Sequence, residues 1–124
     1  MPVVVVDASA VAAILFGEET AEDIVERLDG SELAPSLLPY EIISVARGKV
    51  RRGGASAEAV VIGLGAFARM HIAFHEPDSL AIFRLAVRTG LTAYDAAYLW
   101  LAGSLSAALV TLDEKLERAA AKMA

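Results

Sequence analysis

The sequence contains no cysteine. This absence excludes disulfide bonds, thiol nucleophiles and thiolate metal ligands, so any metal must be bound through oxygen or imidazole nitrogen. A membrane-length apolar run is also missing, because the longest uncharged stretch, 96–112, is interrupted by a glycine and two serines and falls short of the roughly 20 residues that a membrane helix needs. No basic leader precedes the first apolar run, so we expect a cytoplasmic protein with no membrane span.

The chain has no overall excess of positive charge either. It carries 11 lysines and arginines against 16 acidic residues, a formal net charge of -5, so no global basic field attracts nucleic acid. One local basic cluster stands out at an expected helix end, formed by Arg47, Lys49, Arg51 and Arg52. Two interpretations of this cluster remain open. Cations at a helix C-terminus complement the helix dipole, and they also bind phosphate groups.

Apolar runs and turn residues predict alternating strands and helices. The expected strands span 3–6, 32–35, 71–75 and 107–112, and the expected helices span 9–16, 20–28, 38–52, 57–69, 79–89, a segment after Thr92 and a terminal segment after Asp113. Thr20, Ser56 and Asp78 are expected to cap the helices that they open. Such alternation indicates an α/β domain with a mainly parallel central sheet flanked by helices. A length of 124 residues suits one domain over 1–124.

Two strand-like apolar runs each end on an aspartate. The run 3–6 is followed by Asp7, and the run 107–112 is followed by Asp113. Uninterrupted runs of this kind suit strands that are buried on both faces of a parallel sheet. In open α/β sheets the ligand crevice lies beyond the carboxyl ends of the strands, so we expect both aspartates to point into one cleft. Such a pair of like charges is costly without a cation.

Each candidate acid also has a purely structural explanation. Asp7 and Asp113 are placed to cap the helices that follow them, Glu41 lies in a first helical turn where it complements the dipole, and Asp95 lies three residues after an expected N-cap. Asp78 is excluded from the candidate site, because no strand delivers it to the cleft. Considered singly, the acids leave both interpretations open.

Their joint order is more informative than any one of them. The chain carries Val-Val-Asp7-Ala-Ser9, then Glu41 early in a helix, then Leu91-Thr-Ala-Tyr-Asp95-Ala-Ala-Tyr98, and finally Val110-Thr111-Leu-Asp113. Over essentially the whole chain this set resembles the PIN-domain ribonucleases, above all the VapC-type toxins of bacterial and archaeal toxin–antitoxin pairs. The resemblance implies a catalytic, metal-binding site formed by Asp7, Glu41, Asp95 and Asp113, with Ser9 and Thr111 as hydroxyl supports. One departure is Ser44, where such proteins often carry asparagine.

The chemistry of the acids agrees with this resemblance. A site with only oxygen ligands suits Mg²⁺ or Mn²⁺, and such a cation orients water for attack on a phosphodiester. The expected activity is therefore that of a metal-dependent endoribonuclease, a hydrolase, with RNA as substrate and with the basic cluster Arg47, Lys49, Arg51 and Arg52 contacting the RNA backbone. The resemblance also implies a cognate antitoxin and a homodimer, and the apolar runs at 42–43, 60–62 and 98–100 offer candidate contact surfaces.

Two alternatives remain open at this point. The chain is also compatible with a degenerate PIN fold that acts as a non-catalytic interaction module, because four acids can persist as helix caps. An aspartyl phosphotransferase would use Asp7 as its nucleophile. That second alternative is weaker, because the usual second acid two residues later is replaced by Ser9.

Overall fold

The computed structural model describes residues 2–28 and 30–123. Its central sheet has four strands in the order β3-β2-β1-β4, and every strand pair is parallel. The strands are β1 (Val3–Val6), β2 (Ser31–Pro35), β3 (Ala73–His75) and β4 (Ala108–Val110). The predicted α/β class with a parallel central sheet is therefore confirmed.

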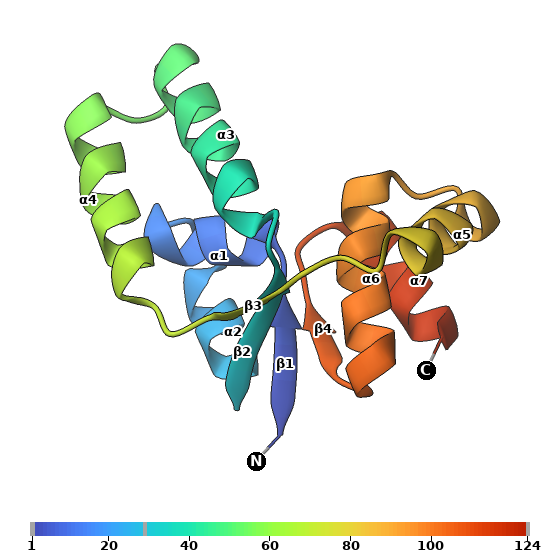
Figure 1. Ribbon diagram of the computed structural model, residues 1–124. Helices are drawn as coiled ribbons and strands as arrows, with labels where there is room; N and C mark the ends of the chain where they lie inside the picture. The colour runs from blue at the N-terminus through green and yellow to red at the C-terminus, as the bar shows by residue number, and fades with distance from the viewer. Residues whose placement is uncertain (1, 29, 124) are drawn as a thin grey trace.

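Seven helices among the described residues cover the two faces of this sheet. They are α1 (Ala8–Leu15), α2 (Ala21–Arg27), α3 (Leu38–Arg51), α4 (Ala57–Arg69), α5 (Ser79–Thr89), α6 (Ala93–Leu105) and α7 (Glu114–Met123). Figure 1 shows α1 to α4 on one side of the sheet and α5 to α7 on the other. The pair α3 and α4 extends beyond the sheet as an arm. None of the described helices is long and apolar enough to cross a membrane.

The strand order reverses its direction at one place in the sheet. Strands β1, β2 and β3 follow one another across the sheet, whereas β4 returns to pair with β1 on its other side. A switch of this kind leaves a gap beyond the carboxyl ends of the two strands at which the winding direction changes. In this chain those strands are β1 and β4, so the residues that directly follow Val6 and Val110 lie where this architecture places its crevice.

Burial differs between the two strands that flank the crevice. β1 is an inner strand, and Val4, Val5 and Val6 are all buried. The expectation that the run 107–112 is buried on both faces is wrong, because β4 is an edge strand in which Ala108 is exposed and only Val110 is fully buried. β3, at the opposite edge, is likewise shorter than the expected 71–75.

Helix α6 is part of the core and carries Asp95 in its first turn. It packs between α5 and α7 and against β1 and β2, and its buried side chains are Ala96, Ala97, Tyr98, Leu99, Leu101 and Ala102. Burial of each leucine contributes about 2 kcal/mol, so this helix is firmly anchored. The apolar run 98–100 therefore belongs mainly to the core and offers little contact surface, contrary to the expectation from sequence.

The helix caps follow the sequence with one exception. Ser56 and Asp78 accept hydrogen bonds from the backbone N–H groups three residues later, as predicted. Thr20 does not cap α2, because it already has helical dihedral angles (φ -80°, ψ -3°) and its side chain makes no capping hydrogen bond. A capping hydroxyl requires an extended backbone at its own position.

Candidate active site

Asp7 directly follows β1, at the point where the strand order reverses. It has extended dihedral angles and caps α1: its Oδ1 accepts hydrogen bonds from the Ala10 N–H at 3.0 Å and the Ser9 hydroxyl at 2.7 Å. The Thr111 hydroxyl donates to its Oδ2. The residue is only 5% exposed. Asp7 is thus a helix cap and, at the same time, a buried acidic group at the carboxyl ends of the strands.

Ser9, which follows β1, and Thr111, which follows β4, each donate a hydrogen bond to the Asp7 carboxylate. The register that pairs Val6 with Val110 brings Asp7 level with Thr111. Each hydroxyl also accepts a backbone hydrogen bond, Ser9 Oγ from the Leu112 N–H at 2.9 Å and Thr111 Oγ1 from the Asp113 N–H at 3.0 Å. These bonds fasten the β1–α1 turn to the segment after β4, so the orientation of the Asp7 carboxylate is fixed.

Glu41 is positioned by a tyrosine on the facing helix. It lies half-buried in the first turn of α3, and the Tyr98 hydroxyl donates a hydrogen bond of 2.6 Å to its Oε1. Tyr98 is buried within α6. Sequence reasoning assigned Tyr98 no role in the site, although its position three residues after Asp95 on one helix was the available signal.

Asp95 and Asp113 are delivered by the starts of two helices. Asp95 lies in the first turn of α6, where its backbone N–H donates to the capping Thr92 hydroxyl at 3.1 Å. Asp113 precedes α7, and its Oδ1 accepts the Leu116 N–H at 2.9 Å. The two side chains come from opposite ends of the α6–β4 segment. Asp78, by contrast, is an exposed cap of α5 that is bonded to its own helix.

The four acids influence one another electrostatically. Burial is the main cause that raises the pKa values of Asp7, Glu41 and Asp95. Negative charge adds to this effect, because Asp113 raises the pKa of Asp7, and Asp7 raises the pKa values of Glu41 and Asp95. Burial and the neighbouring Glu41 also raise the pKa of the Tyr98 hydroxyl, which keeps it a hydrogen-bond donor. Carboxylates that repel one another in this way favour a cation among them.

The carboxylates are near one another without forming a closed ligand cage. Within residues 2–28 and 30–123, no group of three or more histidine and acidic side chains is already arranged to hold a metal ion. Asp7 accepts hydrogen bonds from the Ser9 and Thr111 hydroxyls, and Glu41 accepts one from Tyr98. The oxygen-only donor set fits Mg²⁺, which usually keeps several waters and takes only one or two protein carboxylates directly. Asp7, Glu41, Asp95 and Asp113 are the residues that could hold it.

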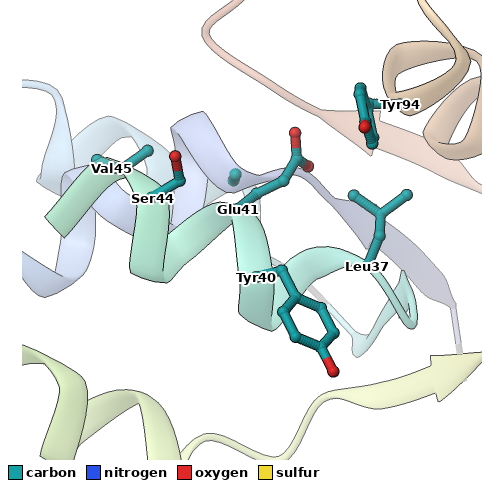
Figure 2. A pocket seen from close by; sticks show the side chains of 7 residues that line it. Leu37, Tyr40, Glu41, Ser44, Val45 and Tyr94 are labelled. Carbon is teal, nitrogen blue, oxygen red and sulfur yellow. The ribbon is translucent and has the colours of Figure 1, made fainter. Parts of the chain in front are cut away.

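A pocket of about 580 Å³ opens beside Glu41. Figure 2 shows Glu41, Ser44 and Val45 projecting from α3, with Tyr94 of α6 lying across from Glu41. Ser44, which occupies the position where the resembling proteins often carry asparagine, lines this pocket and still supplies a polar group. The pocket is therefore a mainly apolar recess, and Glu41 is the one candidate acid among its lining residues.

The basic cluster from the sequence does not share one surface. Lys49 turns toward α1, where its Nζ lies 3.4 Å from Glu18 and 5.7 Å from the centre of the Phe16 ring. Arg47 and Arg51 are exposed on another face of α3, one turn apart. Lys49 is thus committed to packing and ion pairing, whereas Arg47 and Arg51 remain accessible.

Comparison with known proteins agrees with this geometry. Residues 4–122 match the PIN domain family. The chain is 34% identical over 115 residues to Ribonuclease VapC9 of Mycobacterium tuberculosis and to VapC ribonuclease Mb0985 of Mycobacterium bovis, and the aligned region covers 91% of this chain and 87% of each relative. The crystal structure of PAE2754 from Pyrobaculum aerophilum superposes with a TM-score of 0.71 at 26% identity, and the match covers 98% of this chain and 96% of that one.

Proposed function

This chain belongs to the PIN-domain family of VapC-type ribonucleases, and we propose that it is a metal-dependent endoribonuclease that hydrolyses RNA phosphodiester bonds as the toxin of a toxin–antitoxin pair. The observation that carries the proposal is the proximity of Asp7, Glu41, Asp95 and Asp113 beyond the carboxyl ends of β1 and β4. Burial is the main cause that raises the pKa values of Asp7, Glu41 and Asp95, and in each case a neighbouring acid of the four raises the pKa further.

The proposed site assigns a role to each side chain. Asp7, Glu41, Asp95 and Asp113 would hold Mg²⁺ or, in its place, Mn²⁺. The bound cation would neutralise the carboxylates, polarise a phosphodiester oxygen and lower the pKa of an attacking water. Ser9 and Thr111 keep the Asp7 carboxylate in one orientation by donating to both of its oxygens. Tyr98 holds Glu41 in the same way.

Two exposed apolar surfaces support the proposed protein partners. On the α3–α4 arm, Ile43, Val61 and Ile62 are exposed, Ile62 to 72%, and this surface suits an apolar helix of an antitoxin. On α5, Leu80, Phe83 and Val87 are exposed in a helical i, i+3, i+7 pattern, which suits a homodimer contact. We place the protein in the cytoplasm, where RNA and a partner made from a neighbouring gene would meet it.

RNA cleavage by the purified chain tests the proposal. We expect a single-stranded RNA to be cut in the presence of Mg²⁺ and to stay intact in EDTA. Asp95→Asn should abolish cleavage because it removes a proposed metal ligand. Asp78→Asn is the matched control, since Asp78 lies outside the site and asparagine caps a helix as well as aspartate does. Cleavage that survives EDTA, or that responds equally to the two substitutions, would contradict the assignment, and a well-folded chain without cleavage would favour the non-catalytic interaction module.

A further inference from the structure

A second charged recess lies between the C-terminal end of α5 and the helix α7. It has a volume of about 500 Å³, and four basic side chains line it: Arg88, Lys115, Arg118 and Lys122. The other lining residues are neutral. Four of the 11 lysines and arginines of an acidic chain thus converge on one place. We call this recess the α5–α7 groove.

The sequence of α7 explains how the groove becomes basic. Lys115, Arg118 and Lys122 are spaced i, i+3 and i+7, which places them along one flank of a helix. Glu117 lies on another flank, where it forms a 3.8 Å ion pair with Arg27 of α2. The helix therefore turns Lys115, Arg118 and Lys122 toward the groove and Glu117 toward α2, and the three basic residues line the groove together with Arg88 of α5.

Little in the structure compensates this positive charge. Arg118 lies 3.9 Å from Glu114, but both side chains are well exposed (68% and 88%), so the pair is weak. The Lys115 Nζ donates to the Gly90 carbonyl oxygen at 3.4 Å, a contact that leaves its charge in place. Within the part of the chain that the structure describes, Arg88 and Lys122 form no ion pair. The groove is thus ready to receive an anionic ligand.

The groove begins at the edge of the candidate active site. Lys115 is two residues from Asp113 in the sequence, and its Nζ reaches the Gly90 carbonyl oxygen between α5 and α6. From Lys115 to Lys122 the helix extends by about 10 Å. A nucleic-acid strand with one phosphate at the carboxylates would therefore continue along the basic flank of α7.

We propose that the α5–α7 groove binds the backbone phosphates of the RNA strand beside the scissile bond. This inference rests on the proposed ribonuclease function and names a surface for its substrate. The favoured occupant is a phosphate backbone. Its scissile phosphate would lie at the proposed cation site, and its neighbouring phosphates would pair with the basic side chains of the groove. The exposed arginines Arg47 and Arg51 of α3 are a separate surface, since they lie six and ten residues beyond Glu41, or about 9 and 15 Å along the helix.

The salt dependence of RNA binding tests this proposal. The probe is a fluorescent single-stranded RNA, measured by anisotropy in the Asp7→Asn background so that it is not cut. The double variant Arg118→Gln with Lys122→Gln removes two proposed phosphate contacts. The slope of the logarithm of the binding constant against the logarithm of salt concentration should then flatten by about 1.4, so that the loss of affinity between 50 and 200 mM salt shrinks about 7-fold. Arg88→Gln, on the other wall, should flatten the slope by about 0.7. Arg69→Gln removes one exposed charge from the end of α4 and controls for net charge.

The outcomes separate this inference from the proposed function. An unchanged slope in both groove variants, while the wild-type chain cleaves RNA, overturns the groove and leaves the ribonuclease assignment standing. A flattened slope in a chain that does not cleave RNA supports the groove and refutes the assignment. If the groove variants bind RNA normally but lose affinity for the antitoxin, the groove instead receives an acidic protein segment, and the proposal is wrong.

Discussion

Replacing Asp7 in two different ways separates its structural role from its chemical one. Asp7→Asn keeps a side-chain oxygen for the Ala10 N–H and the Ser9 hydroxyl, and asparagine is as good an N-cap as aspartate. Its amide nitrogen would donate to the Thr111 oxygen, and the Thr111 hydroxyl would turn to the Ser9 oxygen 3.4 Å away. It also removes a negative charge whose burial raises the pKa of the carboxyl. Without metal, we therefore expect the Asp7→Asn protein to be as stable as the wild type or more so, yet inactive.

Asp7→Ala should behave differently, because it leaves partners without an acceptor. Loss of the cap costs about 1 kcal/mol, and leaving the buried Thr111 hydroxyl unsatisfied costs about 1–3 kcal/mol. Relief of the buried charge offsets part of this sum. A net loss of about 2 kcal/mol lowers the melting temperature of a domain of this size by about 8 °C.

Thermal unfolding in EDTA, followed by circular dichroism, measures both effects. The expected order of melting temperatures is Asp7→Asn at or above the wild type, and Asp7→Ala clearly below it. Neither variant should cleave RNA in Mg²⁺. If asparagine destabilises the fold as much as alanine does, the charge of Asp7 stabilises the metal-free protein, and the argument from repulsion among the carboxylates is refuted.

Three further predictions concern the surroundings of the site. Tyr98→Phe removes the hydrogen bond to Glu41 and should raise the Mg²⁺ concentration needed for half-maximal cleavage by about 10-fold, with little change in melting temperature; an unaltered Mg²⁺ titration would contradict a positioning role. Arg47→Gln with Arg51→Gln should weaken RNA binding in low salt, whereas Lys49→Gln should mainly lower stability through its lost contact with Glu18, and the reverse pattern in anisotropy and unfolding would refute this division. Folding raises the carboxyl pKa values of Asp7, Glu41 and Asp95, so the metal-free protein binds more protons when folded than when unfolded. The stabilisation from these protons is therefore present below the unfolded pKa of about 4 and is lost as pH rises through the folded pKa values. The free energy of unfolding, measured against pH without metal and again with Mg²⁺ at neutral pH, checks this sign, because Mg²⁺ should restore the lost stability.

The sequence was sufficient to predict the central part of the fold. An apolar run without alternation, ending on Asp7, is typical of an inner parallel strand, and β1 is such a strand. The turn residues around Ser56 and Asp78 predicted the helix starts because capping depends on local contacts only. The α/β class follows from the alternation of these local signals.

Features that depend on tertiary position were not predictable in the same way. The run 107–112 reads like an inner strand, yet β4 lies at an edge, and strand order is decided by contacts between distant segments. The sequence places Lys49 beside Arg47 and Arg51, but only the tertiary structure shows that its side chain pairs with Glu18. The hydrogen bond between Tyr98 and Glu41 joins residues 57 positions apart. The α5–α7 groove likewise lies between two helices that are separated in the sequence by α6 and β4.

The proposed function depends on a divalent cation held by the carboxylates at the carboxyl ends of β1 and β4. Anomalous diffraction from a crystal grown with Mn²⁺ tests it most directly. We expect an anomalous peak near these residues, with at least one oxygen of Asp7, Glu41, Asp95 or Asp113 at a ligand distance of about 2.1 Å, and no peak in crystals of Asp7→Asn. A peak confined to other acids, such as Asp78, or none at saturating Mn²⁺, would contradict it.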